Sequence, residues 1–120
     1  MESIRSIAQL IIALGILNVW LLRFNKATIY RGGAAKNMKE EFATYGLPVW
    51  FLWFIGGLKV LLALSLLLSF WKPELMRPAA IGMAILMAGA VGMHMKIGDA
   101  LKKTTPALSV LILSLLVAFI

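Results

Sequence analysis

Four long runs of apolar residues dominate this 120-residue chain, and they decide what it can fold into. They cover residues 4–22, 49–71, 79–95 and 104–120. About 20 apolar residues in a helix cross the ~30 Å hydrocarbon core of a bilayer, and each run approaches that length. Hydrophobic residues make up 62% of the chain, more than a soluble domain with a wetted surface carries. The sequence therefore predicts an all-α fold, a single membrane domain built as a four-helix bundle.

The first and last runs need separate arguments. The first run is long for the apolar core of a signal peptide, and no small-x-small cleavage site precedes Arg23, so we expect it to be retained as a span. The last uninterrupted run, residues 107–120, has only 14 residues. A helix that crosses the bilayer there must begin inside the preceding loop, which places its predicted start near residue 104.

Residues 23–47 form the main polar segment of the chain. Gly32-Gly33 interrupts it, and the sequence predicts a short amphipathic helix over residues 34–45 that lies at the membrane interface or caps the bundle. The predicted apolar face consists of Ala35, Met38, Phe42 and Tyr45. The predicted polar face consists of Lys36, Lys39, Glu40 and Glu41.

The formal net charge of +7 is distributed unevenly between the loops. The first and third loops carry eight basic residues: Arg23, Lys26, Arg31, Lys36, Lys39, Lys96, Lys102 and Lys103. The opposite side carries three: Arg5, Lys72 and Arg77. Because basic loops stay in the cytoplasm, we expect both long loops to be cytoplasmic and both termini to lie outside a bacterial inner membrane. The basic residues do not form a helix interleaved with aromatics, so no nucleic-acid partner is expected.

Several chemistries are excluded by composition. The chain has no cysteine and only one histidine, which rules out dithiol redox chemistry and a histidine-based zinc cluster. No catalytic constellation is recognisable, and Glu40 and Glu41 diverge by about 100° on a helix, so they are no acid/base pair. We expect no metal site and no catalytic residues, and at most a membrane subunit of an oxidoreductase.

Lys59 is the most informative single residue, because it lies near the middle of the second span. A cation at that depth costs about 2.5–3.5 kcal/mol on insertion scales, so Lys59 should face the bundle interior or a partner. Lys59 precedes Trp71 by 12 residues and His94 follows Pro78 by 16, which places the two at depths that differ by only about 6 Å. A polar pocket near the long loops is therefore predicted. Its candidate residues are Asn18, Glu40, Glu41, Tyr45, Lys59, His94 and Asp99.

Small residues indicate where the helices approach closely. Ala80, Ala84, Ala88 and Gly92 recur every four residues in the third span, and Gly56-Gly57 marks the second. Such residues let membrane helices pack against each other. We interpret them as intramolecular packing positions, with an oligomer interface as the alternative.

Two polar segments resemble a known family. They read YRGGAAKNMKEEFATYGLP (residues 30–48) and MHMKIGDALKKTTPA (residues 93–107). Together with the four spans they resemble the DoxX-like family of small membrane proteins, named after a subunit associated with thiosulfate:quinone oxidoreductase. The resemblance implies a link to quinone-coupled redox chemistry, with a quinone as the cofactor to consider. Many members carry an acidic residue in the second span where this chain has Lys59, so the charge at that position is inverted.

Three functions follow from these features. The leading hypothesis is an accessory or ligand-binding membrane subunit whose polar pocket holds a lipid-soluble or anionic ligand. The first alternative is a small transporter subunit for an anion or lipophilic solute, since no carboxylate lies within a predicted span for cation-proton exchange. The second is an assembly or scaffold protein whose loop helix binds a membrane or cytoplasmic partner.

Overall fold

A computed structural model describes residues 2–26 and 30–120, and all its regular elements are helical. Four of its helical segments are long and apolar enough to cross a membrane, which confirms the predicted helical membrane bundle. The elements in chain order are α1 (Glu2–Leu17), the π-helical η1 (Asn18–Leu22), α2 (Met38–Thr44), α3 (Val49–Leu68), the 3-10 turn η2 (Pro73–Leu75), α4 (Met76–Lys96) and α5 (Leu101–Phe119).

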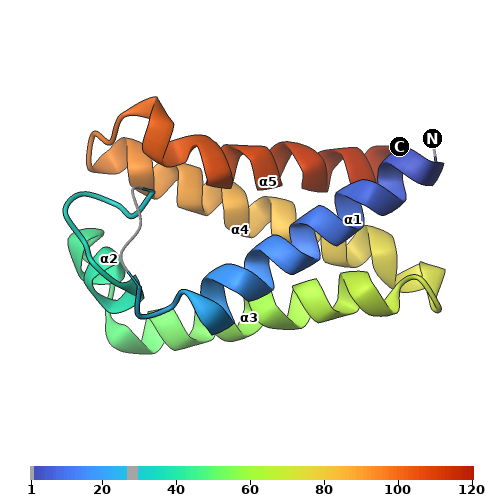
Figure 1. Cartoon of the computed structure of the whole chain (residues 1–120), viewed down its shortest axis with the longest axis horizontal. Helices are drawn as coiled ribbons and strands as arrows, with labels where there is room; N and C mark the ends of the chain where they lie inside the picture. Colours follow the sequence, from blue (N-terminus) through green and yellow to red (C-terminus); the bar gives the residue numbers. More distant parts are fainter. Residues whose placement is uncertain (1, 27–29) are drawn as a thin grey trace.

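The four long helices form a ring in which α1 packs against α3 and α5, and α4 packs against the same two helices. Both termini and the turn between α3 and α4 lie at one end, and α2 with the two remaining loops lies at the other (Figure 1). The molecule is 39 Å long, close to the ~40–45 Å of a bilayer with its headgroups. The loops that carry eight basic residues thus share one end; their placement in the cytoplasm stays a prediction.

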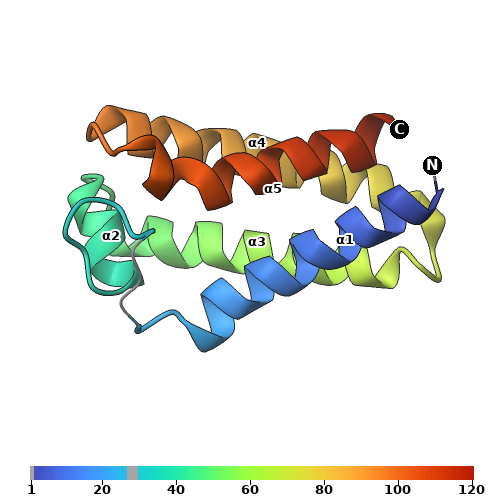
Figure 2. The ribbon, with the colours of Figure 1, turned by 45° about the horizontal axis from the view of Figure 1, so that its top comes forward.

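Polar side chains hold the helices together at the end with the termini. The Gln9 amide donates a hydrogen bond to Ser69 Oγ at 2.7 Å, which joins α1 to the end of α3. Arg77 Nε donates to the carbonyl of Ala118 at 2.8 Å, which joins α4 to α5. Figure 2 shows that α1 and α5 lie close together at this end and diverge towards α2. The bundle is therefore wider beneath the first loop.

The core and the outer surface are both apolar. Ile12, Leu52, Leu66, Met83 and Val117 are fully buried between the helices. Large apolar side chains also cover the outside of every long helix, including Leu14, Leu61, Ile85, Ile112 and Phe119. Water would penalise so much exposed apolar surface, whereas lipid tails solvate it.

The loop helix differs from its prediction in two respects. It begins at Met38 rather than at residue 34, because Asn37 caps it: Asn37 Oδ1 accepts a hydrogen bond from the Glu40 N–H at 2.9 Å. Gly33, which precedes it, has a positive φ of 55°, and this conformation is incompatible with an α-helix. Glu41 is also buried, although the sequence placed it on the polar face with Glu40.

The helices also run over slightly different residues than the predicted spans. The second membrane segment ends at Leu68. The third begins at Pro73 if the turn η2 is counted with α4, and the fourth already begins at Leu101. Pro106 lies inside α5, in its second turn, where it removes the hydrogen bond that an N–H would donate to the Lys102 carbonyl.

The small residues pack unevenly. Ala80, Ala84 and Gly56 are buried, whereas Ala88, Gly92 and Gly57 are exposed. The stripe on α4 therefore packs within the chain only over its first half. An oligomer interface over the exposed half stays a prediction.

Candidate functional site: a cavity beneath the first loop

A cavity of about 940 Å³ lies where α1 and α5 diverge. It is lined by the end of α1 with η1, the first half of α3, the second half of α4, the start of α5 and the first loop. Its walls are mostly apolar, with side chains such as Ile16, Phe51, Ile55, Leu86 and Val110. A concave, mainly apolar site with a few polar groups is the usual form of a small-molecule site.

Lys59 is the charged group of α3 in this cavity. Its side chain is only 8% exposed, and its ammonium lies 5.6 Å from the centre of the Trp20 ring. A cation over an aromatic face is attracted by the ring quadrupole, and more strongly where water is excluded. Trp20 therefore helps to hold a buried cation within a membrane-spanning helix.

Trp20 reaches Lys59 because α1 and α3 approach closely at Gly56. Trp20 lies on the π-helical turn η1, a distortion that often marks functional positions. A Cβ at position 56 would lie 2.3 Å from a carbon of the Trp20 ring, so only glycine fits there. A Cβ on the neighbouring Gly57 would meet no atom within 4 Å.

We expect Gly56→Ala to displace the Trp20 ring and to lower the free energy of unfolding by about 1–3 kcal/mol, the usual effect of overpacking. Gly57→Ala makes the same chemical change on the exposed side of the helix and should cost little. Unfolding in detergent, followed by tryptophan fluorescence, measures both variants. Equal stability of the two variants would contradict the close approach at Gly56.

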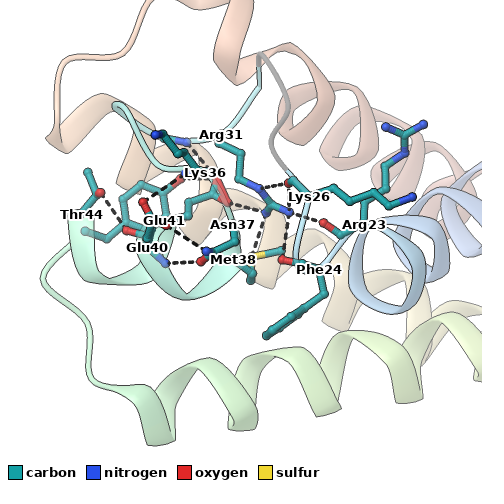
Figure 3. Close-up of polar contacts among 12 residues, drawn as sticks. Arg23, Phe24, Lys26, Arg31, Lys36, Asn37, Met38, Glu40, Glu41 and Thr44 are labelled. Carbon is teal, nitrogen blue, oxygen red and sulfur yellow. Dashed lines mark hydrogen bonds and ion pairs between the residues drawn. The ribbon is translucent and has the colours of Figure 1, made fainter.

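A buried ion pair between Arg31 and Glu41 organises the first loop. Arg31 Nη1 lies 3.2 Å from Glu41 Oε2, and both side chains are nearly inaccessible. The same guanidinium donates to the carbonyls of Arg23, Phe24 and Lys26, as Figure 3 shows. Arg31 thus fixes the polypeptide that leaves η1 against α2.

Glu41 is saturated by donors in this arrangement. Besides Arg31, it accepts hydrogen bonds from the Gly32 N–H at 3.0 Å and from the Tyr45 hydroxyl at 3.1 Å. Burial, together with the neighbouring Glu41 charge, raises the pKa of Tyr45 above its usual value. Tyr45 therefore stays a neutral donor at the edge of the cavity.

His94 continues the polar chain from Tyr45 to the third loop. His94 Nε2 lies 3.4 Å from the Tyr45 hydroxyl, and His94 Nδ1 lies 2.7 Å from Asp99 Oδ2. Burial opposes ionisation of Asp99, but the hydrogen bonds with His94 and the Gly33 N–H and the nearby charge of Lys103 outweigh it, so the pKa of Asp99 is lowered. Asp99 thus orients the imidazole that faces the cavity.

The first and third loops are also joined directly. The Gly33 N–H donates to Asp99 Oδ1 at 3.0 Å, and the Gly33 carbonyl accepts from Lys103. Lys96 Nζ donates to the Tyr45 carbonyl at 3.1 Å. The first loop is therefore bonded to both ends of the α4–α5 connection.

The structure brings most of the predicted pocket residues together. Asn18, Glu41, Tyr45, Lys59 and His94 line the cavity. Asp99 lies behind His94, outside the cavity wall, and contacts that side chain.

Glu40, by contrast, is exposed. It accepts from the Asn37 amide at 2.9 Å and belongs to the cap of α2 (Figure 3).

The cavity wall also includes residues that were not among the predicted ones, notably Trp20, Arg31 and Lys103. From the sequence, Arg31 is only one of the basic loop residues that set orientation. A polar segment that contains an arginine and a glutamate ten residues apart gives no sign, by itself, that the two form a buried pair.

Four apolar spans that surround a buried cation define a small helical integral membrane protein. The chain belongs to the DoxX-like family, whose model matches residues 16–119. This confirms the resemblance of its two polar segments. Comparison with curated proteins and with solved structures gives no match.

Proposed function

We propose that this protein is an accessory, ligand-binding membrane subunit whose cavity holds a lipid-soluble molecule with a polar head. The observation that carries the proposal is the Lys59 ammonium inside a largely apolar cavity of about 940 Å³. A volume near the upper end of the ~300–1,000 Å³ range of ligand sites accommodates a ring with a chain.

A few polar groups stand in a mostly apolar wall, which supports a ligand with two chemically different parts. Lys59 donates from α3, and His94 and Tyr45 lie beneath the first loop. Apolar walls from α1, α4 and α5 provide the surroundings for a hydrocarbon tail. A quinone has this form, since its carbonyl oxygen accepts a hydrogen bond and its tail is apolar, and it agrees with the redox link of the family name.

The test is a titration of the purified protein in non-ionic detergent with a short-chain quinone. Trp20 lines the cavity, so a bound quinone should quench tryptophan fluorescence in a saturable manner. Lys59→Met keeps the volume of the side chain and removes the charged donor. We expect it to weaken quinone binding about tenfold or more, the usual effect of losing a charge-assisted hydrogen bond.

The matched control is Lys72→Met, the same change at an exposed position at the opposite end of the molecule. It should bind quinone like the wild type. If Lys59→Met also binds quinone with unchanged affinity, Lys59 is not part of a ligand site and the proposal fails.

A further inference from the structure

The charges on the cavity wall narrow the choice of head group for the proposed ligand. Apart from His94, the charged side chains that line the cavity are four cations and one carboxylate: Arg23, Arg31, Lys59, Lys103 and Glu41. Low-dielectric walls strengthen the field of such charges, because solvent does not screen them. The cavity therefore favours a negatively charged ligand.

The one carboxylate attracts Lys59 through its charge but forms no ion pair with it. Glu41 is bonded to the Arg31 guanidinium, the Gly32 N–H and the Tyr45 hydroxyl. The described residues form two ion pairs, Arg31–Glu41 and His94–Asp99, and neither contains Lys59. The ammonium of Lys59 instead lies over the Trp20 ring and is attracted to Glu41 only at a distance, with no ion pair.

The remaining cations of the wall differ from Lys59 in position. Arg31 is occupied by Glu41 and three carbonyls, and Lys103 donates to the Gly33 carbonyl. Arg23 is exposed at the end of η1. Lys59 is the cation that lies deepest among the apolar side chains, where an opposite charge has its largest effect.

We infer that the cavity selects an amphiphile with a monoanionic head group and a single hydrocarbon chain, whose charge pairs with Lys59. The inference rests on the proposed function and specifies the ligand class of the same site. A cavity of about 940 Å³ suits one chain rather than the larger volume of a two-chain phospholipid. The anionic head forms the direct ion pair that Lys59 lacks among the described residues, and the chain lies along the apolar walls.

The probes are a brominated long-chain carboxylate and the brominated alcohol of the same chain, added to protein in nanodiscs of zwitterionic lipid. Bromine quenches tryptophan fluorescence, and Trp50, Trp53 and Trp71 are exposed, so all proteins in this experiment carry phenylalanine at these three positions and both probes then report on Trp20. We expect wild-type protein to prefer the carboxylate about tenfold or more. Lys59→Met should abolish most of this preference, and the control Lys72→Met should keep it.

The outcomes separate the two proposals. Equal binding of carboxylate and alcohol by the wild type overturns the anion inference and leaves the ligand site in place. An unchanged preference in Lys59→Met also overturns it. If neither probe nor the quinone quenches saturably, the proposed function itself fails. The wild-type comparison decides the matter even if Lys59→Met does not fold.

Discussion

Replacement of Arg31 by alanine is expected to lower the free energy of unfolding by about 3–5 kcal/mol, the usual cost of removing one partner from a buried ion pair. Arg31 is 4% exposed, and its loss leaves the Glu41 carboxylate buried without a counter-ion. Three backbone carbonyls would lose a donor at the same time. Unfolding in mixed micelles, followed by circular dichroism, measures the change.

Lys26→Ala is the matched control. It removes an exposed basic side chain from the same loop and keeps the Lys26 carbonyl that Arg31 uses. We expect it to change stability by less than about 0.5 kcal/mol. The double variant Arg31→Met/Glu41→Gln should lose less free energy of unfolding than the sum of the losses in Arg31→Met alone and Glu41→Gln alone, because it leaves no unpaired buried charge. Equal stability of Arg31→Ala and Lys26→Ala would contradict the described role of the pair.

Asp99→Asn should lower the free energy of unfolding by about 1–3 kcal/mol at neutral pH. Asp99 accepts from the Gly33 N–H with one oxygen and contacts His94 Nδ1 with the other, and an asparagine amide can keep only one of these acceptors. Glu74→Gln is the control, since it neutralises an exposed carboxylate in η2 at the opposite end. It should leave stability nearly unchanged.

The effect of Asp99→Asn should depend on pH in a defined direction. The pKa of Asp99 in the folded protein lies below its ordinary value of 3.8. Ionised Asp99 therefore stabilises the fold above that value, and the contribution is lost as the pH falls through the folded pKa. The gap in stability between wild type and Asp99→Asn should be constant near neutrality and narrow below about pH 4. A gap that widens on acidification would contradict the described hydrogen bonds.

The sequence predicted the bundle because four apolar runs permit few other folds. It also placed Lys59 and His94 at similar depths, since these follow from the tight turn between the second and third spans, and both line the cavity. Depth along a helix is fixed by its rise per residue, so such counting succeeds where an element is long and regular.

The first loop could not be predicted in the same way. Periodicity placed Glu41 on the outer face of the loop helix, but Arg31 and the Gly32 N–H hold it inside. A buried carboxylate is favourable only with donors around it, and these come from a segment without regular structure. Residue spacing does not reveal how the first loop runs over the cavity. Trp20, Arg31 and Lys103 were therefore not predicted as cavity residues.

The bonds between the first and third loops also bear on how a molecule of the proposed kind would exchange. On the side of the aqueous loops, the Gly33–Asp99 hydrogen bond and the Arg31–Glu41 pair hold the first loop in place over the cavity. Between α1 and α5 the helices diverge (Figure 2), and no side-chain hydrogen bond of the described residues joins the two helices. We therefore expect exchange to occur between α1 and α5, from the bilayer. Occupancy of the cavity would then follow the concentration of the molecule dissolved in the lipid, not its concentration in water.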